Sequence, residues 1–287
     1  MKSLKAKGQD VGKRKKTSET LMAVITWGAA AVTMGVLLFL ILFILIRGVP
    51  HITPDLFSLN YTSDNVSLTP AMVSTVMITL MSLVVAVPLG VFSAIYLVEY
   101  AGRGNKAVTL VRTTTETLSG IPSIVYGLFG MLFFVNFLHL GYSLLAGALT
   151  LAVMILPLIM RSSEEALKAV PDTYREGAFG LGSGRLRTVF RIVLPSAMPG
   201  ILAGVILAVG RIVGETAALI YTSGTATEMP SGPLSSARTL SVHMYSISSE
   251  GLHTDQGYAT AVVLMAVVIG INTLSAFIAK RVGGKAR

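Results

Sequence analysis

Residues 176–195 read EGAFGLGSGRLRTVFRIVLP, a stretch of mixed charge in an otherwise apolar chain. It follows the apolar segment Leu140 to Met160 and leads into another, Ile192 to Thr227, and each segment is long enough to cross a bilayer. Its spaced positions form the pattern Glu-Gly-Ala-x3-Gly-x9-Ile-x-Leu-Pro, from Glu176 to Pro195. The stretch is therefore predicted to be a surface loop between two membrane-spanning helices.

A short helix is predicted at the start of this loop. Pro171 suits its first turn, Asp172 lies near the positive end of the helix dipole, and Gly182 suits a C-cap. The helix would carry an apolar stripe beside Glu176, and two interpretations stay open: it presents the stripe to a partner, or it covers its own bundle. The stripe consists of Tyr174, Ala178, Phe179 and Leu181.

The composition suits a lipid solvent. Of the 287 residues, 53% are hydrophobic and 13% are charged, and the mean hydropathy is +0.72, whereas soluble domains carry roughly a quarter charged residues. The absence of cysteine excludes disulfides and thiolate metal sites, and the four histidines show no metal-ligand spacing. Neither Gly-x4-Gly-Lys-Ser/Thr nor Gly-x-Ser-x-Gly occurs, so the chain is not expected to hydrolyse ATP or to carry a serine nucleophile of that type.

Several segments are long enough to span roughly 30 Å of hydrocarbon, which takes about 20 residues. Each must be helical in lipid, because unpaired backbone groups there cost several kcal/mol. The chain is therefore predicted to be an all-α integral membrane protein with six transmembrane helices. The first is predicted to be an uncleaved anchor, because it exceeds a signal-peptide core and no small-x-small site follows it before Arg47. The six segments are Leu21–Ile46, Ala71–Val98, Thr117–Leu138, Leu140–Met160, Ile192–Thr227 and Gln256–Ala279.

The chain divides into three predicted parts. Residues 1–20 form a basic cytoplasmic tail that is expected to be disordered, residues 21–46 form the first transmembrane helix, and residues 70–282 form a five-helix core that contains the loop 171–195. Within the third span, residues 119–123 read Ser-Gly-Ile-Pro-Ser, which favours a broken helix over an ordinary kink. The outer loop 223–255 is long enough to be functional, but its sequence indicates no role.

The distribution of Lys and Arg predicts the orientation. Six spans put both termini on one side, and that side carries 20 of these residues against 2 on the other, Arg47 and Arg238. Both termini and the Glu176 loop are therefore predicted to be cytoplasmic. This topology explains the net charge of +9, with some attraction to anionic lipid, and nucleic acid is not an expected partner.

Arg211 and Glu215 are the charged residues of the fifth span. On one helix they would share a face near mid-membrane, where a charge costs about 2.5–3.5 kcal/mol on insertion scales. Arg211 is a candidate anion ligand, because its guanidinium can bind a tetrahedral oxyanion bidentately. Glu215 could hold Arg211 in place, or accept a hydrogen bond from a protonated oxyanion, which fully ionised sulfate cannot donate. The alternative is a pair that only fixes helix packing.

Two further positions stay open. Arg161 ends the fourth span, where it could line an inner vestibule or serve as a positive-inside anchor. Arg112 and Glu116 repeat the four-residue spacing nearer the cytoplasmic end, where a solvated salt bridge is favoured over a place in a substrate path.

The Glu176 loop resembles a loop of the binding-protein-dependent ABC importer permeases, which have a MetI-like fold and present this loop to their ATPase. Gly177 departs from the alanine that is usual there. Two stretches, GIPSIVYGLFG at residues 120–130 and GRIVGETA at residues 210–217, narrow the resemblance to phosphate permeases, although Ala218 replaces a proline common there. Residues 239–260 look more like the PstA than the PstC subunit. The resemblance covers residues 70–282.

The resemblance implies a type I importer subunit that forms a path for inorganic phosphate with a PstC-type sister permease. The pair would sit on a PstB-type ATPase dimer and receive phosphate from an external PstS-type binding protein, in a bacterial or archaeal plasma membrane. The ATPase would bind ATP and Mg, so this chain would hold no cofactor and catalyse no reaction. Arg211, Glu215 and Arg161 would line the path. Coupling to the ATPase would use Tyr174, Glu176, Ala178, Phe179, Leu181 and Gly182.

Three other functions stay open from the sequence. A permease for molybdate or sulfate would share the Glu176 loop, but would match the Arg-x3-Glu-Thr-Ala segment less well. A secondary anion transporter would usually show inverted repeats, which the sequence does not reveal. A membrane scaffold would leave Arg211 and the loop unexplained.

Overall fold

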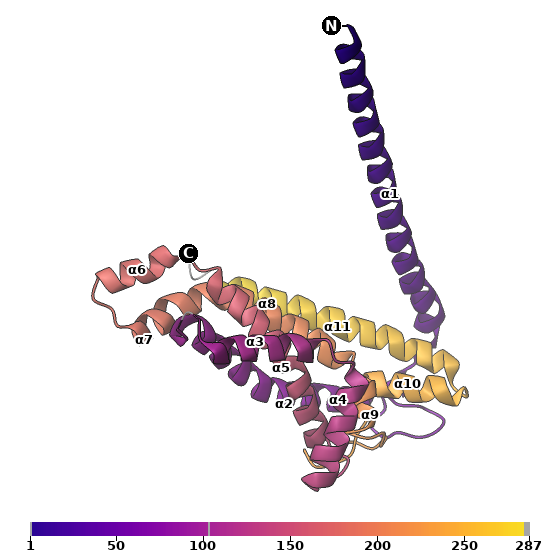
Figure 1. The fold of residues 1–287 in the computed structure, drawn as a ribbon. Coiled ribbons are helices and arrows are strands. Elements are labelled where there is room, and N and C mark those ends of the chain that lie inside the picture. The colour runs from indigo at the N-terminus through magenta and orange to yellow at the C-terminus, as the bar shows by residue number, and fades with distance from the viewer. Residues whose placement is uncertain (1, 103, 284–287) are drawn as a thin grey trace.

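The computed structural model describes residues 2–102 and 104–283, with side chains described for residues 19–102, 104–274 and 277. Over these residues the chain is a bundle of helices joined by loops, and no strand occurs among them (Figure 1). Five helices are long and apolar enough to cross a membrane, and six spans result when a bent pair counts as one. The longest helices are α1 (Lys2–Gly48), α2 (Thr69–Ile95), α5 (Leu144–Lys168), α8 (Leu194–Val213) and α11 (Thr254–Gly283).

The third span is broken, as predicted. α3 (Lys106–Ser119) and α4 (Ser123–Gly130) meet at an angle of 103°. The break falls at Pro122, which lacks an N–H for the helix ladder and takes an extended conformation, with ψ of 143°. The Tyr126 hydroxyl donates a 2.8 Å hydrogen bond to the carbonyl of Leu118 across the bend, which fixes the two halves relative to each other.

The core lies where α2, α5 and α8 pack together. Ile78 of α2, Ile155 of α5 and Ile212 of α8 are all buried in one apolar cluster. Small residues let these helices approach closely, as is common in membrane bundles. At Gly204 of α8, an added Cβ would lie 1.8 Å from Oγ of Ser162 on α5, so no larger residue fits there without moving the helices.

Short helices lie at the two ends of the bundle. α6 (Asp172–Gly180) and α7 (Arg185–Thr188) lie together at one end, while α9 (Ala217–Ile220) and α10 (Leu240–Glu250) lie towards the other (Figure 1). A π-helical turn, Val189–Val193, joins α7 to α8. This separation agrees with the prediction that the Glu176 loop and the 223–255 loop lie on opposite sides of the membrane.

The fifth span differs from its prediction. The helix is continuous from Arg185 to Val213 and then ends, whereas the apolar run extends to Thr227. Gly214 caps the helix, and the next carboxylate, Glu215, accepts a hydrogen bond from a backbone N–H beyond the turn. An apolar run indicates burial in lipid or protein but does not show where the backbone leaves the helix.

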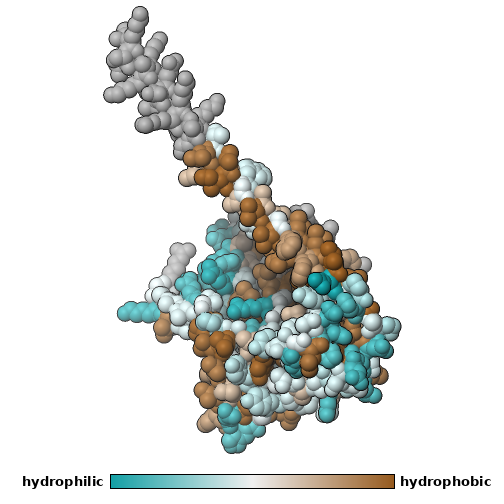
Figure 2. Space-filling view, turned by 90° about the vertical axis from the view of Figure 1, so that its right-hand side faces the viewer, coloured by the Kyte–Doolittle hydropathy of each residue, from teal (hydrophilic) through white to brown (hydrophobic). Residues whose placement is uncertain are grey.

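α1 leaves the rest of the bundle (Figure 1), and the predicted disorder of residues 2–20 is wrong because the backbone there is helical. Extending an existing helix costs much less than nucleating one, so the apolar span can carry helix into the tail. Near its C-terminal end α1 packs on α11, where Phe43 and Tyr258 make an edge-on ring contact at 5.8 Å. The rest of its described apolar surface is exposed (Figure 2).

Candidate functional site

The short helix predicted in the Glu176 loop is α6. It starts after Pro171, has Asp172 in its first turn, and ends with Leu181 as the cap residue. Gly182 follows with φ of +78°, a left-handed conformation that favours glycine. The N–H groups of Gly182 and Ser183 donate to the carbonyls of Phe179 and Ala178 at 2.9 Å each, which is a Schellman motif. Both predicted ends of this helix are therefore confirmed.

Arg175 attaches α6 to the end of α2. Its Nη2 and Nε lie 2.8 and 3.1 Å from Oε1 of Glu99, which sits in the π-helical turn that extends α2. Its remaining N–H groups donate to the carbonyls of Leu167 (2.9 Å) and Val170 (2.8 Å) at the end of α5, and to Oδ1 of Asp172 (3.1 Å). The side chains of Arg175 and Glu99 are only 15% and 8% exposed. One guanidinium thus joins α2, α5 and α6.

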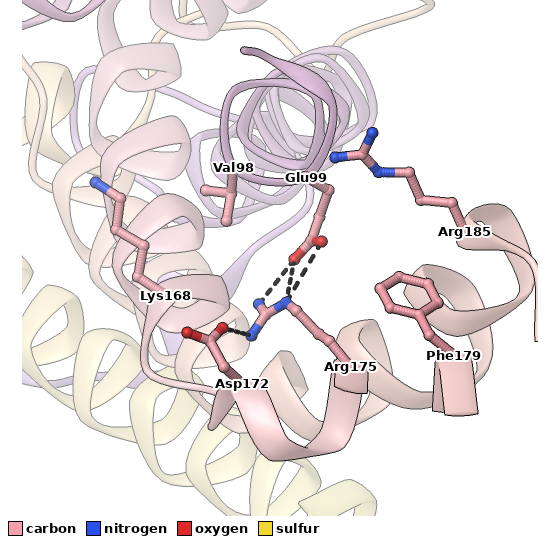
Figure 3. Close-up of a pocket in the computed structure, with 7 residues that line it drawn as sticks. All are labelled: Val98, Glu99, Lys168, Asp172, Arg175, Phe179 and Arg185. Atoms are coloured by element: carbon pink, nitrogen blue, oxygen red, sulfur yellow. Dashed lines mark hydrogen bonds and ion pairs between the residues drawn. The ribbon is translucent and has the colours of Figure 1, made fainter. Parts of the chain in front are cut away.

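A pocket of about 570 Å³ lies beside this ion pair, under α6 (Figure 3). Arg175 points at Glu99 from one side, and Arg185 of α7 points towards the same helix from the other. The Arg185 guanidinium lies 5.2 Å from the ring centroid of Tyr100, a cation–π contact. Two cations therefore connect the end of α2 to α6 and α7. Arg175 pairs with the Glu99 carboxylate, and Arg185 lies over the Tyr100 ring.

The outer face of α6 is apolar and exposed. Tyr174 and Phe179 are about half exposed, Leu181 is 92% exposed, and Glu176 is exposed beside them, while Ala178 is buried. The interpretation that α6 covers its own bundle holds for Ala178 alone. Phe179 lines the pocket beside Arg185 (Figure 3). Tyr174, Phe179 and Leu181 nevertheless stay exposed, as a docking surface requires.

Arg211 and Glu215 are not on one helix face, because α8 ends between them. No ion pair or hydrogen bond joins the Arg211 side chain to another described residue. Arg211 is half-buried and near enough to Tyr126 for the two to interact electrostatically. The predicted pairing of Arg211 with Glu215 is therefore wrong in its geometry.

Glu215 organises the turn after α8. Its side chain is buried, and Oε1 accepts a hydrogen bond from the N–H of Ala218 at 3.1 Å, at the start of α9. Its backbone carbonyl accepts a 2.6 Å hydrogen bond from the Ser241 hydroxyl of α10. Glu215 thus holds α9 and α10 next to the turn that follows Arg211.

α4 supports the same turn through its glycines. An added Cβ at Gly127 would lie 2.8 Å from Cα of Ala218, so α9 rests directly on the α4 backbone. At Gly130 an added Cβ would lie 2.2 Å from Oγ1 of Thr150 on α5. The GIPSIVYGLFG stretch therefore brings Tyr126 beside Arg211 by keeping α4, α5 and α9 in close contact.

The remaining predicted cations lie near the α6 end of the bundle. Arg161 is exposed and pairs with Glu165 at 3.2 Å. The sequence spacing favoured a salt bridge between Arg112 and Glu116, but Arg112 pairs with Glu164 instead. Its Nη2 lies 2.6 Å from Oε1 of Glu164, and Nζ of Lys168 lies 2.6 Å from the same oxygen. The Arg112 pair ties α3 to α5.

Sequence reasoning missed Glu99 and Glu164, the two buried carboxylates of these ion pairs. Glu99 is 76 residues from Arg175 along the chain, so no local spacing links them.

A family model matches residues 86–287, and its description is the binding-protein-dependent transport system inner membrane component. The chain belongs to this family. It is 34% identical over 241 residues to the probable ABC transporter permease protein YqgI of Bacillus subtilis, across 79% of this chain and 82% of that protein. It is 36% identical over 212 residues to the phosphate transport system permease protein PstA 2 of Mycobacterium bovis, across 72% and 70%.

The fold is that of a solved transporter. An inward-facing structure of the MetNI methionine ABC transporter matches with a TM-score of 0.57 and 20% identity, across 84% of this chain and 96% of that chain. The prediction of an all-α, MetI-like ABC importer permease is confirmed. As a member of this family the chain is a multi-pass membrane permease subunit of an ABC importer, and ATP hydrolysis belongs to a separate ATPase subunit.

Proposed function

We propose that this permease forms part of the path of an ATP-driven importer of inorganic phosphate. The observation that carries the proposal is Arg211, a half-buried guanidinium in a membrane-spanning helix with no ion-pair partner among the described residues. The likeness to the mycobacterial phosphate permease PstA 2 supports phosphate as the anion. Phosphate is a tetrahedral oxyanion, and a guanidinium can donate two parallel hydrogen bonds to it.

Glu215 would contribute to the choice of anion. Its buried carboxylate stays close to the turn after Arg211 without neutralising that guanidinium by an ion pair. A carboxylate repels a fully ionised sulfate, but it can accept a hydrogen bond from a phosphate that keeps a proton. Arg161, at the other end of α5 from the outer loops, would be a second and weaker cation on the inner side of the path.

α6 would couple the path to the ATPase. Its exposed Tyr174, Glu176, Phe179 and Leu181 would dock in a groove of a PstB-type ATPase dimer, while Ala178 and Gly182 set the packing and the end of the helix. ATP and Mg bound by that dimer would close it, and hydrolysis would reset it. The Arg175–Glu99 ion pair would carry the movement of α6 to α2.

The proposal includes the partners and the orientation of the chain. A PstC-type sister permease would supply the other half of the path, and a PstS-type protein would deliver phosphate on the outer side. The chain would sit in a bacterial or archaeal plasma membrane with both termini cytoplasmic, because 20 of its Lys and Arg residues fall on that side.

Anion selectivity tests the proposal. Uptake of radiolabelled phosphate, with sulfate and molybdate in separate assays, is measured in cells that carry this permease with its partners and in cells that lack it. We expect uptake of phosphate alone, and an excess of unlabelled sulfate should not compete. Uptake of sulfate or molybdate at an equal or higher rate would refute phosphate as the substrate.

A further inference from the structure

Arg238 is a buried cation that the central site does not use. It lies immediately before α10 and is only 5% exposed. Within the described part of the chain its guanidinium has neither an ion pair nor a hydrogen bond, and its Nη2 is fully enclosed. Among the described residues its aromatic contact is with Tyr61, whose ring centroid lies 4.7 Å from Cζ. Tyr61 belongs to the first outer loop, which joins α1 to α2.

His243 lies one turn into α10 and completes the same cluster. It is fully buried, and neither ring nitrogen makes a hydrogen bond of good geometry among the described residues, although the backbone of Val66 lies near enough to interact with the ring. Its ring meets that of Tyr61 edge-on at 6.2 Å. Burial, and then the nearby charge of Arg238, lower the pKa of His243 to about 3. The imidazole is therefore neutral at physiological pH and can donate one N–H hydrogen bond.

The cluster thus holds the full positive charge of Arg238, and the enclosed Nη2 of that guanidinium has no acceptor among the described residues. Enclosing a guanidinium is costly unless an opposite charge compensates it, and a single aromatic ring offsets only part of that cost. Buried polar groups without partners in a folded protein need an explanation. A bound anion is an explanation that suits a cation beside a neutral N–H donor. The chemistry of these groups favours an oxyanion.

The first turn of α10 connects this cluster to the proposed path. Thr239 caps the helix, and the Ser241 hydroxyl donates to the carbonyl of Glu215 at 2.6 Å. The start of α10 therefore follows Arg238 directly along the chain and contacts the turn after Arg211. An anion held at Arg238 would lie beside Tyr61.

We propose that Arg238 and His243, beside the first turn of α10, form an outer phosphate-binding site that precedes Arg211 along the path, with Tyr61 of the first outer loop covering it. The inference rests on the proposed function, because it assumes that phosphate arrives from the outer side. Arg238 would bind phosphate through its guanidinium, and His243 would donate to a second oxygen. Movement of the outer loop would uncover the site.

The test measures thermal unfolding of the complete importer complex, purified without the binding protein and with its nucleotide sites filled by a non-hydrolysable ATP analogue. Each sample is compared in phosphate and in chloride at equal ionic strength. An Arg211→Ala background removes the proposed central ligand, so any remaining stabilisation by phosphate reports on another site. In that background Arg238 is left unchanged or replaced by Lys or Gln, and Tyr61→Phe, which keeps the ring, is the matched control.

We expect phosphate to raise the Tm of Arg211→Ala, to raise it less with Arg238→Lys, and not to raise it with Arg238→Gln; Tyr61→Phe should keep the full rise. No rise in Arg211→Ala, or an equal rise with Arg238→Gln, would overturn the outer site. If the Gln variant fails to assemble, the Lys variant decides, because an undiminished rise there also overturns it. A wild-type complex that transports sulfate and not phosphate would instead overturn the proposed function.

Discussion

Arg211→Ala is expected to reduce phosphate uptake to near background at unchanged membrane abundance, while Arg211→Lys keeps a small part of it. Lysine retains the charge but loses the planar fork that binds two oxygens, and alanine loses both. A hydrogen bond to a charged group is worth about 1.5–3 kcal/mol, so losing two of them accounts for a fall of two orders of magnitude or more. Initial uptake rates, normalised to membrane abundance, give the ranking.

The control for Arg211 is Glu215. If the only role of Arg211 were to hold Glu215 in place, removing both side chains would restore assembly. The double variant Arg211→Ala/Glu215→Ala would then regain abundance and uptake. The structure gives Glu215 other partners, the N–H of Ala218 and the hydroxyl of Ser241, so the double variant should stay inactive. Recovered uptake in it would count decisively against an anion site at Arg211.

Removing either Arg175 or Glu99 should damage both assembly and coupling. Each side chain is largely buried, and loss of one partner leaves the other charge enclosed, which costs about 3–5 kcal/mol. Arg175→Ala also removes the hydrogen bonds to the carbonyls of Leu167 and Val170, so it should be the worse of the two. We expect low complex yield, and in the complex that does assemble, ATP hydrolysis that the loaded binding protein no longer stimulates.

Two controls separate folding from coupling at this pair. Glu165→Ala breaks the exposed ion pair with Arg161, worth at most about 1 kcal/mol, and should leave yield and stimulated ATPase activity normal. Arg175→Met/Glu99→Leu leaves no unpaired charge, so yield should recover while stimulation stays low. Full stimulation in that double variant would show that the ion pair serves folding alone.

Local patterns predicted local structure well. The ends of α6 follow from Pro171, Asp172 and Gly182, and the broken span follows from Pro122, because each of these residues constrains its own backbone. The apolar runs gave the spans and the fold class for a similar reason, since lipid leaves the backbone only helical options. Such effects act over a few residues and can be read directly from the chain.

The site was predicted less completely, because its contacts are not local. The four-residue spacing of Arg211 and Glu215 suggested a shared helix face, and the helix ends between them at Gly214. The Arg175–Glu99 pair joins residues that only the placement of α6 beside the turn after α2 brings together. Arg238 counted in the sequence only as an outer-side cation, since its burial depends on how the first outer loop, which carries Tyr61, packs against it.

The most direct measurement of the proposed mechanism is phosphate accumulation in proteoliposomes. One preparation holds the complete complex with external binding protein and internal ATP, a second holds the same complex with a non-hydrolysable ATP analogue, and a third holds this chain alone. We predict that radiolabelled phosphate rises above its external concentration in the first preparation and in neither of the others. Accumulation by the chain alone, or without ATP hydrolysis, would contradict a permease driven by a separate ATPase.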